Sequence, residues 1–149
     1  MSKEVRVAEA TVDDAVRVNA TVIEFDEPYD QRHFEERING KNHLILVGSV
    51  DGKPAGYMVS YEDERYPNSF YLWMAGVNPE NRGQGVLKAL MEHQESWAKE
   101  KGYAKLILKT RNERREMLSF LVKYDWNFIE VMPKEKIENT EILVEKVIA

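Results

Sequence analysis

The run GVNPENRGQGVLKAL, residues 76 to 90, contains the pattern in this sequence that is best suited to binding an anion. Two glycines, Gly83 and Gly85, stand directly before a helix-like stretch. The first turn of a helix presents backbone N–H groups without a partner in the helix, and the aligned peptide dipoles add about half a positive charge there. Glycine lets the backbone turn with positive φ and approach a ligand closely, and Arg82 and Lys88 can add full charges at the rim. The run therefore predicts a phosphate-binding turn.

Two common phosphate motifs do not account for this turn. A P-loop requires G-x-x-x-x-G-K-[ST], and the sequence contains no such run. The dinucleotide fingerprint requires a third glycine where Lys88 stands, and no early first strand leads into the loop. A bare G-x-G is equally typical of a tight turn between a strand and a helix.

Length and composition limit the classes of protein that need to be considered. A chain of 149 residues fits one domain, so we expect residues 1–149 to form a single domain, and 43% apolar with 32% charged residues is typical of soluble globular proteins. No apolar run approaches the ~20 residues of a membrane span, and the N-terminus lacks the apolar core of a secretory signal. We therefore expect a cytoplasmic protein that does not contact membranes. The absence of cysteine excludes disulfides and a cysteine nucleophile, and the three histidines have no metal-binding spacing, so we expect no metal.

The charge is unevenly distributed along the chain. A net charge of -5 argues against a nucleic-acid partner. Residues 81–115 nevertheless contain 9 Lys and Arg against 4 Asp and Glu. This local excess of positive charge fits an anion site at the glycines, although a solvated helix face would explain it as well.

Apolar periodicity and turn residues predict the element order β-α-α-β-β-β-α-β-α-β-β. Strands are expected at Val5 to Val7, His43 to Val50, Ala55 to Tyr61, Ser69 to Val77, Lys105 to Thr110, Phe128 to Val131 and Ile142 to Ile148. Helices are expected from Val12 with Thr11 as the N-cap, at Gln31 to Ile38, from Val86 to a stop at Gly102, and around Met117 to Tyr124. The strand, helix and strand from Phe70 to Thr110 form a crossover unit, which makes two neighbouring strands parallel. The outcome is a mixed sheet with helices on both faces.

The glycine run, taken in this element order, resembles the acetyl-CoA pyrophosphate loop of the GNAT superfamily of N-acetyltransferases. The family pattern is [Q/R]-x-x-G-x-[G/A]; Arg82 and Gly85 match it, while Leu87 replaces the small third residue. The resemblance covers essentially the whole chain, element by element. It implies an α/β fold (an α+β mixed sheet) with about seven strands and about four flanking helices. It also implies that the parallel pair of strands splays apart at the cofactor site.

The resemblance implies which residues bind the co-substrate acetyl-CoA. The pyrophosphate would be bound, mainly through backbone N–H groups, by Arg82, Gly83, Gln84, Gly85, Val86 and Leu87. Gly76 and Val77 would lie along the pantetheine arm. Asn112 is similar to a family asparagine at the pantetheine and the start of the following helix; a plain helix N-cap is the alternative.

The resemblance also implies a direct attack of a primary amine on the thioester in a ternary complex. A main-chain N–H within Met74 to Gly76 would hold the oxyanion. The family pattern L-Y-x-K-x-G-F corresponds here to FLVKYDW, residues 120–126, which puts Leu121 at the tyrosine position. Tyr124, one turn further along the helix, is the candidate acid, and packing of its ring against the sheet is the other interpretation.

The acceptor site is expected beside the loop between the first two helices. That loop supplies Glu24 as the candidate general base and Asp26 and Glu27 as candidate substrate-binding residues, unless all three are simply solvated. Tyr71 and Trp73 on the strand before the glycine run are the aromatic candidates. The negative charge of the three acidic residues suits a cationic acceptor, either a small-molecule amine or a peptide amine.

Three functions remain open from the sequence. The first is an acetyl-CoA-dependent N-acetyltransferase, the second a non-catalytic coenzyme A-binding regulatory module, and the third a structural domain without a ligand. Leu87 and Leu121 favour the second slightly, whereas the intact loop from Arg82 to Gly85 is required by the first two. The resemblance also suggests a homodimer formed through the C-terminal strands.

Overall fold

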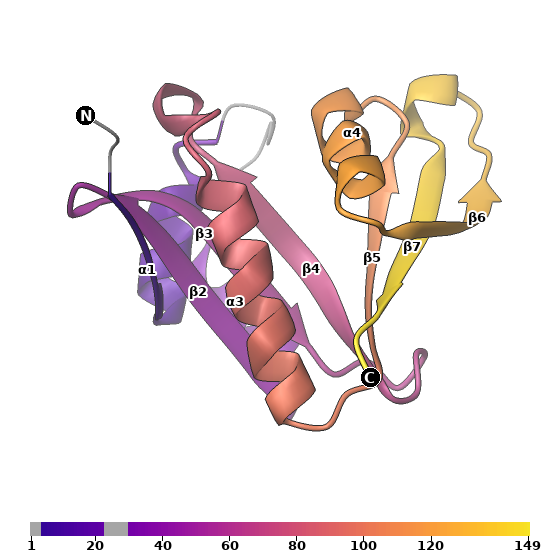
Figure 1. The fold of residues 1–149 in the computed structure, drawn as a ribbon, viewed down its shortest axis with the longest axis horizontal. Coiled ribbons are helices and arrows are strands. Elements are labelled where there is room, and N and C mark those ends of the chain that lie inside the picture. The colour runs from indigo at the N-terminus through magenta and orange to yellow at the C-terminus, as the bar shows by residue number, and fades with distance from the viewer. Residues whose placement is uncertain (1–3, 23–29) are drawn as a thin grey trace.

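The computed structural model describes residues 4–22 and 30–149, and its elements follow the predicted order (Figure 1). The strands are β1 (Val5–Glu9), β2 (His43–Val50), β3 (Lys53–Tyr61), β4 (Ser69–Val77), β5 (Lys105–Arg111), β6 (Asn127–Met132) and β7 (Glu141–Val147). The helices are α1 (Val12–Asn19), α2 (Gln31–Ile38), α3 (Val86–Glu100) and α4 (Arg115–Lys123), with short 3-10 turns η1 (Pro79–Asn81) and η2 (Ile137–Asn139).

Helices α1 and α2 begin at side chains that accept hydrogen bonds from their first turns. The Thr11 hydroxyl accepts from the Asp14 N–H at 3.2 Å, and the Asp14 carboxylate accepts from the Thr11 N–H at 3.1 Å. The Asp30 carboxylate accepts from the His33 N–H at 2.9 Å. These contacts confirm Thr11 as the N-cap of α1. In both helices a side chain at the N-terminus accepts a hydrogen bond from a first-turn N–H group that has no acceptor within the helix.

Within residues 4–22 and 30–149, seven strands form one sheet in the order β1-β2-β3-β4-β5-β7-β6, and β4 and β5 are its one parallel pair. The turn between β2 and β3 contains just Asp51 and Gly52, with φ of 49° and 85°. Two residues with positive φ match the right-handed twist of a hairpin, so β3 begins at Lys53, two residues before the predicted start at Ala55.

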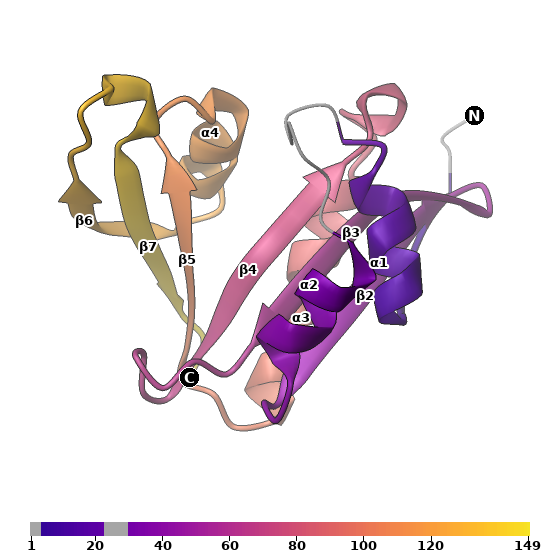
Figure 2. The same ribbon diagram turned by 180° about the vertical axis from the view of Figure 1, so that it is seen from behind.

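Helices cover both faces of the sheet, as the sequence predicts. Helices α1 and α2 lie on one face of the N-terminal strands, and α3 lies on the other face (Figures 1 and 2). Helix α4 packs on the same side as α3 but over β5 and β7 (Figure 1). The C-terminal strands β5, β7 and β6 therefore carry a helix on one face only among the described residues.

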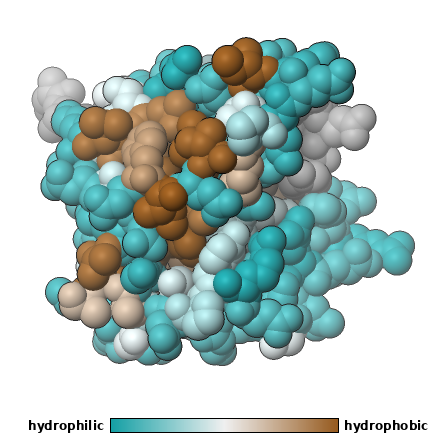
Figure 3. Space-filling model, turned by 90° about the vertical axis from the view of Figure 1, so that its right-hand side faces the viewer, coloured by the Kyte–Doolittle hydropathy of each residue, from teal (hydrophilic) through white to brown (hydrophobic). Residues whose placement is uncertain are grey.

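Strand β6 forms one edge of the sheet, and apolar side chains gather around it (Figure 3). In the part of the chain that the structure describes, every large apolar side chain that is exposed comes from residues 122–147. These side chains are Val122, Phe128, Ile129, Val131, Ile137 and Val147. The edge thus combines unpaired backbone groups with an apolar surface.

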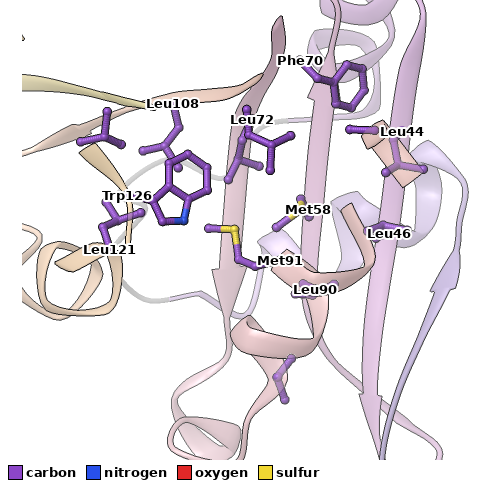
Figure 4. Close-up of a cluster of buried hydrophobic side chains, with 14 of the residues drawn as sticks. Leu44, Leu46, Met58, Phe70, Leu72, Leu90, Met91, Leu108, Leu121 and Trp126 are labelled. Atoms are coloured by element: carbon purple, nitrogen blue, oxygen red, sulfur yellow. The ribbon is translucent and has the colours of Figure 1, made fainter. Parts of the chain in front are cut away.

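A buried cluster on the α3 side joins the two halves of the sheet (Figure 4). Leu72 and Met91 come from β4 and α3, whereas Leu108, Leu121 and Trp126 come from the C-terminal half. A second cluster, on the α1 and α2 side, is rich in aromatic side chains. Over its middle strands, the sheet therefore has an apolar core on each of its two faces.

Candidate functional site

The glycine loop between β4 and α3 is held by its own polar groups. Asn78 caps η1 by accepting from the Asn81 N–H at 3.1 Å, and the Asn81 amide donates to the Gln84 side chain at 3.0 Å. The Arg82 Nε donates to the Val77 carbonyl at 3.1 Å. These contacts fix the path of the backbone between the end of β4 and the start of α3.

The start of α3 differs from the starts of α1 and α2. Its N-cap is Gly85, with φ of 86° and no side-chain hydrogen bond, and Gly83 has φ of 76°. The Ala89 N–H donates to the Gly85 carbonyl at 3.0 Å, which is the first hydrogen bond of the helix. The preceding N–H groups, from Val86 to Lys88, therefore point out of the helix end without an intrahelical acceptor. This is the geometry of an anion-binding turn.

Two glycines of the hairpin seat the first turn of α3 on the sheet. A Cβ at Gly48 would lie 3.0 Å from the Val86 Cγ1, and a Cβ at Gly56 would lie 2.8 Å from the same atom. A Cβ at Gly56 would also lie 3.0 Å from the Gly76 carbonyl oxygen. Sequence reasoning did not identify either glycine; glycine at two positions of a hairpin otherwise rich in β-branched residues was the available signal.

The parallel strands part at the end that faces the glycine loop. Their pairing runs from Ser69 with Lys105 to Leu72 with Leu108 and then ends, although both strands continue. At the same place β4 contains a bulge, because Ser60 pairs with Leu72 and Val59 with Met74. The predicted splay is therefore present, and the bulge at Trp73 turns β4 away from β5.

Backbone groups of β4 line the resulting gap. The Asn78 N–H donates to the Ala55 carbonyl on β3 at 2.8 Å, so Asn78 faces away from the gap. Because backbone groups alternate along a strand, the N–H and C=O groups of Ala75 and Val77 face the gap. The Ala75 N–H lies within the stretch Met74 to Gly76 that the sequence singled out as an oxyanion donor.

The aromatic acceptor candidates lie on the face opposite α3. The Trp73 ring lies 5.3 Å from Phe34 and 5.5 Å from His33 of α2, with the Arg37 guanidinium 4.6 Å from its centroid. Tyr71 is buried between Tyr61 and Tyr66, and this burial raises the pKa of Tyr71 to about 12. Tyr71 therefore stays protonated at neutral pH. Glu24, Asp26 and Glu27 lie outside the described residues.

The candidate acid lies at the end of α4. Tyr124 is the C-cap of α4, half-buried against Phe120 at 4.5 Å, and the Lys88 ammonium lies 6.0 Å from its ring. Since Lys88 belongs to the first turn of α3, Tyr124 and the glycine loop are neighbours in space. Leu121, at the tyrosine position of the family pattern, is fully buried in the core.

Asn112 is not the N-cap of α4. That position is Arg114, and α4 starts at Arg115. The Asn112 N–H donates to the Thr140 carbonyl at 2.9 Å, and its side-chain amide donates to the Ile137 carbonyl at 3.4 Å. Asn112 thus joins the end of β5 to the connection between β6 and β7.

Neither a metal site nor a membrane span accompanies this arrangement in residues 4–22 and 30–149. No group of three His, Asp or Glu side chains there could hold a metal ion. No helix in this part of the chain is long and apolar enough to cross a membrane.

Comparison with known proteins identifies the family. The model of the acetyltransferase (GNAT) family matches residues 11–125. The chain belongs to the GNAT family. As a GNAT acetyltransferase it is an acyltransferase, and acetyl-CoA is its co-substrate. The match covers both the glycine loop and the strands that part beside it.

Individual relatives agree with the family assignment. An acetyltransferase from Pectobacterium atrosepticum, ECA0875, is 27% identical over 109 residues, which cover 72% of this chain and 75% of the relative. IAA acetyltransferase from Bacillus cereus has a similar fold, with a TM-score of 0.79 at 17% identity over 97% of this chain and 99% of the other. An acetyltransferase from Salmonella typhimurium, solved with its cofactor acetyl-CoA, has a TM-score of 0.76 at 14% identity over 97% of this GNAT chain and 94% of its own.

Proposed function

We propose that this GNAT protein is an N-acetyltransferase that moves the acetyl group of acetyl-CoA to a primary amine by direct attack in a ternary complex. We further propose that residues 1–149 act as one N-acetyltransferase domain. The observation that carries the proposal is the uncapped start of α3, built on Gly83 and Gly85, directly beside the gap between β4 and β5.

The residues present fit acetyl-CoA at this place. A Cβ at Gly83 or Gly85 would meet nothing within 4 Å, so both glycines leave open space in front of the helix start. In the proposed complex the N–H groups of Val86 and Leu87 bind the diphosphate, and Arg82 and Gln84 brace the loop. Gly76 and Val77 border the pantetheine arm, and Asn112 lies across the gap at the end of β5. Bound acetyl-CoA supplies a thioester whose carbonyl carbon an amine can attack.

Two groups among the described residues are proposed to act at the reacting centre. The Ala75 N–H faces the gap and would stabilise the oxyanion that develops on the carbonyl; loss of such a donor costs ~10²–10³ in rate. The Tyr124 hydroxyl would donate a proton to the leaving thiolate. Tyr124→Phe keeps the ring and its packing against Phe120 but removes the proton, so kcat should fall while the affinity for acetyl-CoA stays unchanged. An unchanged kcat would remove Tyr124 from the mechanism.

The amine acceptor is proposed to bind on the face opposite α3. Trp73 and the buried Tyr71 would form its aromatic wall, Glu24 would take the proton from the amine, and Asp26 and Glu27 would attract its positive charge. An acceptor with a free primary amine fits this set, either a small molecule or a peptide. A panel in which acceptors without an amine outperform amines would contradict this assignment.

The absence of cysteine makes the decisive assay simple. Any free thiol released from acetyl-CoA in the presence of an amine must be coenzyme A, because the protein has no thiol of its own. Thiol release with any amine supports the transferase. Tight binding of acetyl-CoA without release across amines and peptides would favour the regulatory module instead.

A matched pair of variants tests the place of the cofactor. Gly85→Glu should abolish binding of acetyl-CoA, because it sets a carboxylate against the diphosphate. Gly52→Glu is the control, since Gly52 has φ of 85°, close to the 86° of Gly85, and the same open surroundings, but lies in the hairpin turn. Equal affinity in the two variants would reject this placement of the site.

We also propose that the protein forms a homodimer in the cytoplasm and does not bind nucleic acid. The dimer proposal rests on the exposed edge strand β6 with Phe128, Ile129 and Val131, where two copies can pair antiparallel edges. Val131→Lys should shift the mass in solution to that of a monomer; a monomeric parent protein would refute the dimer. The cysteine-free sequence and the net charge of -5 support the other two points.

A further inference from the structure

The two strands that border the gap differ sharply in charge from the rest of this acidic protein. Strand β4, SFYLWMAGV, contains no charged residue, and β5, KLILKTR, contains three cations and no carboxylate. The ends of these strands that do not pair with each other therefore bring two cations to the gap, Lys109 and Arg111, of which Arg111 forms an ion pair with Glu113 at 2.8 Å. Positive charge beside a reaction site indicates that a substrate bound there carries a negatively charged group.

The register of the sheet shows that these cations face away from the cofactor loop. Paired residues of neighbouring strands share a face, and Lys109 pairs with Leu143, whereas Arg111 pairs with Glu141. Leu143 and Ile107 belong to the core on the α1 and α2 side. Lys109 and Arg111 thus lie on the face opposite α3, which is the face proposed above for the amine acceptor. The diphosphate of acetyl-CoA, on the α3 face, does not explain them.

One carboxylate on this face is shared by two ammonium groups. The Glu141 carboxylate lies 3.1 Å from the Lys134 Nζ and 3.8 Å from the Lys109 Nζ. Both lysines hold the pKa of Glu141 below its usual range, with the Lys134 hydrogen bond as the largest cause. Glu141 is therefore charged at neutral pH but can neutralise only one of its two partners. The cluster keeps a surplus positive charge.

This cluster borders a hollow that is large enough for a substrate group. The hollow measures about 410 Å³ and is lined by Arg111, Lys134, Glu135, Lys136, Asn139 and Glu141. It lies where β5 ends and β7 begins, beside the connection between β6 and β7, and Lys109 adjoins it through its contact with Glu141. Across the gap, on the same face, the Arg37 guanidinium lies 4.6 Å from the centroid of the Trp73 ring.

We propose that the amine acceptor also carries a carboxylate, and that Lys109 and Lys134 bind this carboxylate next to Glu141. The proposal rests on the N-acetyltransferase function and narrows its substrate class to amino acids or peptides that present a free carboxylate near the reacting amine. The amine end lies at the gap beside Trp73, and the carboxylate end meets the lysines. Lys109 and Lys134 thereby determine specificity without taking part in the chemistry.

Matched acceptor series test this proposal. Each series consists of an amino acid, its amide and its decarboxylated amine, for example lysine, lysinamide and cadaverine, with thiol release from acetyl-CoA as the readout. We expect kcat/KM for the amino acid to exceed that of both partners about ten-fold or more, since a hydrogen bond to a charged group has that strength. The amine of the amide is less basic than that of the amino acid, so more of it is unprotonated at neutral pH. A higher kcat/KM for the amino acid can therefore not come from a larger fraction of free amine.

Three lysine variants separate a binding role from a structural one. Lys109→Met and Lys134→Met should lower kcat/KM for the amino acid about ten-fold and leave the decarboxylated amine unchanged. Lys105→Met is the control, because Lys105 lies on the same strand and face but pairs with Glu145 at 3.4 Å in the closed part of the sheet. It should change neither acceptor. Affinity for acetyl-CoA should stay constant in all three.

The possible results separate this inference from the function on which it rests. Thiol release that is equal for the three members of each series, or greater for the amide or amine, overturns the carboxylate site and leaves the transferase intact. A loss that affects all members equally in Lys109→Met and Lys134→Met also overturns it. Absence of thiol release with every member overturns both proposals.

Discussion

Replacement of Gly48 by alanine should lift the first turn of α3 from the sheet. The added Cβ would lie 3.0 Å from the Val86 Cγ1, whereas carbon atoms attract best at ~3.5–4.0 Å. Its distances of 3.5 and 3.6 Å to Leu90 atoms are ordinary contacts. The close contact that the new Cβ would make is therefore with a single methyl group of Val86, the first residue of α3.

The expected magnitude follows from this one contact. Overpacking of a core by one methyl group destabilises a protein by ~1–3 kcal/mol. Val86 is 1% exposed, so Val86→Ala alone should also destabilise, by ~1–3 kcal/mol through loss of buried methyl groups. In the double variant the new methyl group occupies space that the lost one has vacated. The two changes should thus compensate by ~1 kcal/mol or more.

A double-mutant cycle measures this compensation. Urea unfolding of the parent, both single variants and the double variant gives the coupling free energy, and titration calorimetry gives the Kd for acetyl-CoA. Gly48→Ala should weaken binding and the double variant should recover most of it, because the N–H groups of α3 return to their place. Additive unfolding free energies, within ~0.3–0.5 kcal/mol, with unchanged Kd values would refute the seating of α3 by Gly48.

Three further predictions concern stability. Asp125 follows α4 with φ of 66°, where the family pattern has glycine, so Asp125→Gly should raise the unfolding free energy by up to ~1 kcal/mol; a lower melting temperature would contradict this. The Asp63 carboxylate accepts hydrogen bonds from the Arg65 guanidinium, the shortest at 2.7 Å, and from the Arg65 N–H at 2.9 Å, and the guanidinium contact is the largest cause that lowers the pKa of Asp63. The resulting stabilisation is complete above the unfolded pKa of ~3.9 and is lost as pH falls through the folded value. Asp63→Asn should therefore differ from the parent in urea unfolding at pH 6 and converge with it toward pH 3, and a constant difference would exclude this cause. The buried Ser60 hydroxyl donates to the Gln94 carbonyl oxygen, and the Gln94 amide nitrogen has no partner among the described residues. Ser60→Ala should thus destabilise by ~1–3 kcal/mol, Ser60→Ala with Gln94→Met should regain most of that loss in thermal melts, and a double variant no more stable than the single one would count against it.

Much of the fold could be predicted from local patterns. Thr11 with Asp14, Asp51 with Gly52 and the glycines before α3 each specify a cap or a turn through chemistry within a few residues. The limits of α2 and β4 agree with prediction for the same reason. The start of β3 does not, because the turn consists of only Asp51 and Gly52, and the strand begins at Lys53 instead of the predicted Ala55.

The parts of the site that depend on pairing between distant segments could not be predicted. The bulge at Trp73 follows from the fit of β4 to β3, and no residue type in SFYLWMAGV announces it. The contacts of Gly48 and Gly56 with Val86 and of Lys109 with Glu141 join residues that are more than 20 positions apart. Such contacts depend on register, and register emerges only once the whole sheet is assembled.

The short parallel pairing of β4 with β5 has a mechanical consequence. Only four residue pairs, from Ser69 with Lys105 to Leu72 with Leu108, connect the hydrogen-bonded ladders of the two lobes of the sheet. We expect this short ladder to act as a hinge about which the two lobes rock. The buried cluster that contains Trp126 packs between the lobes at the hinge, whereas at the open end only a bound ligand would fill the space between them. A molecule lodged between the strand ends would damp that rocking, so slower amide hydrogen exchange on both sides of the hinge would report occupancy without any chemical turnover.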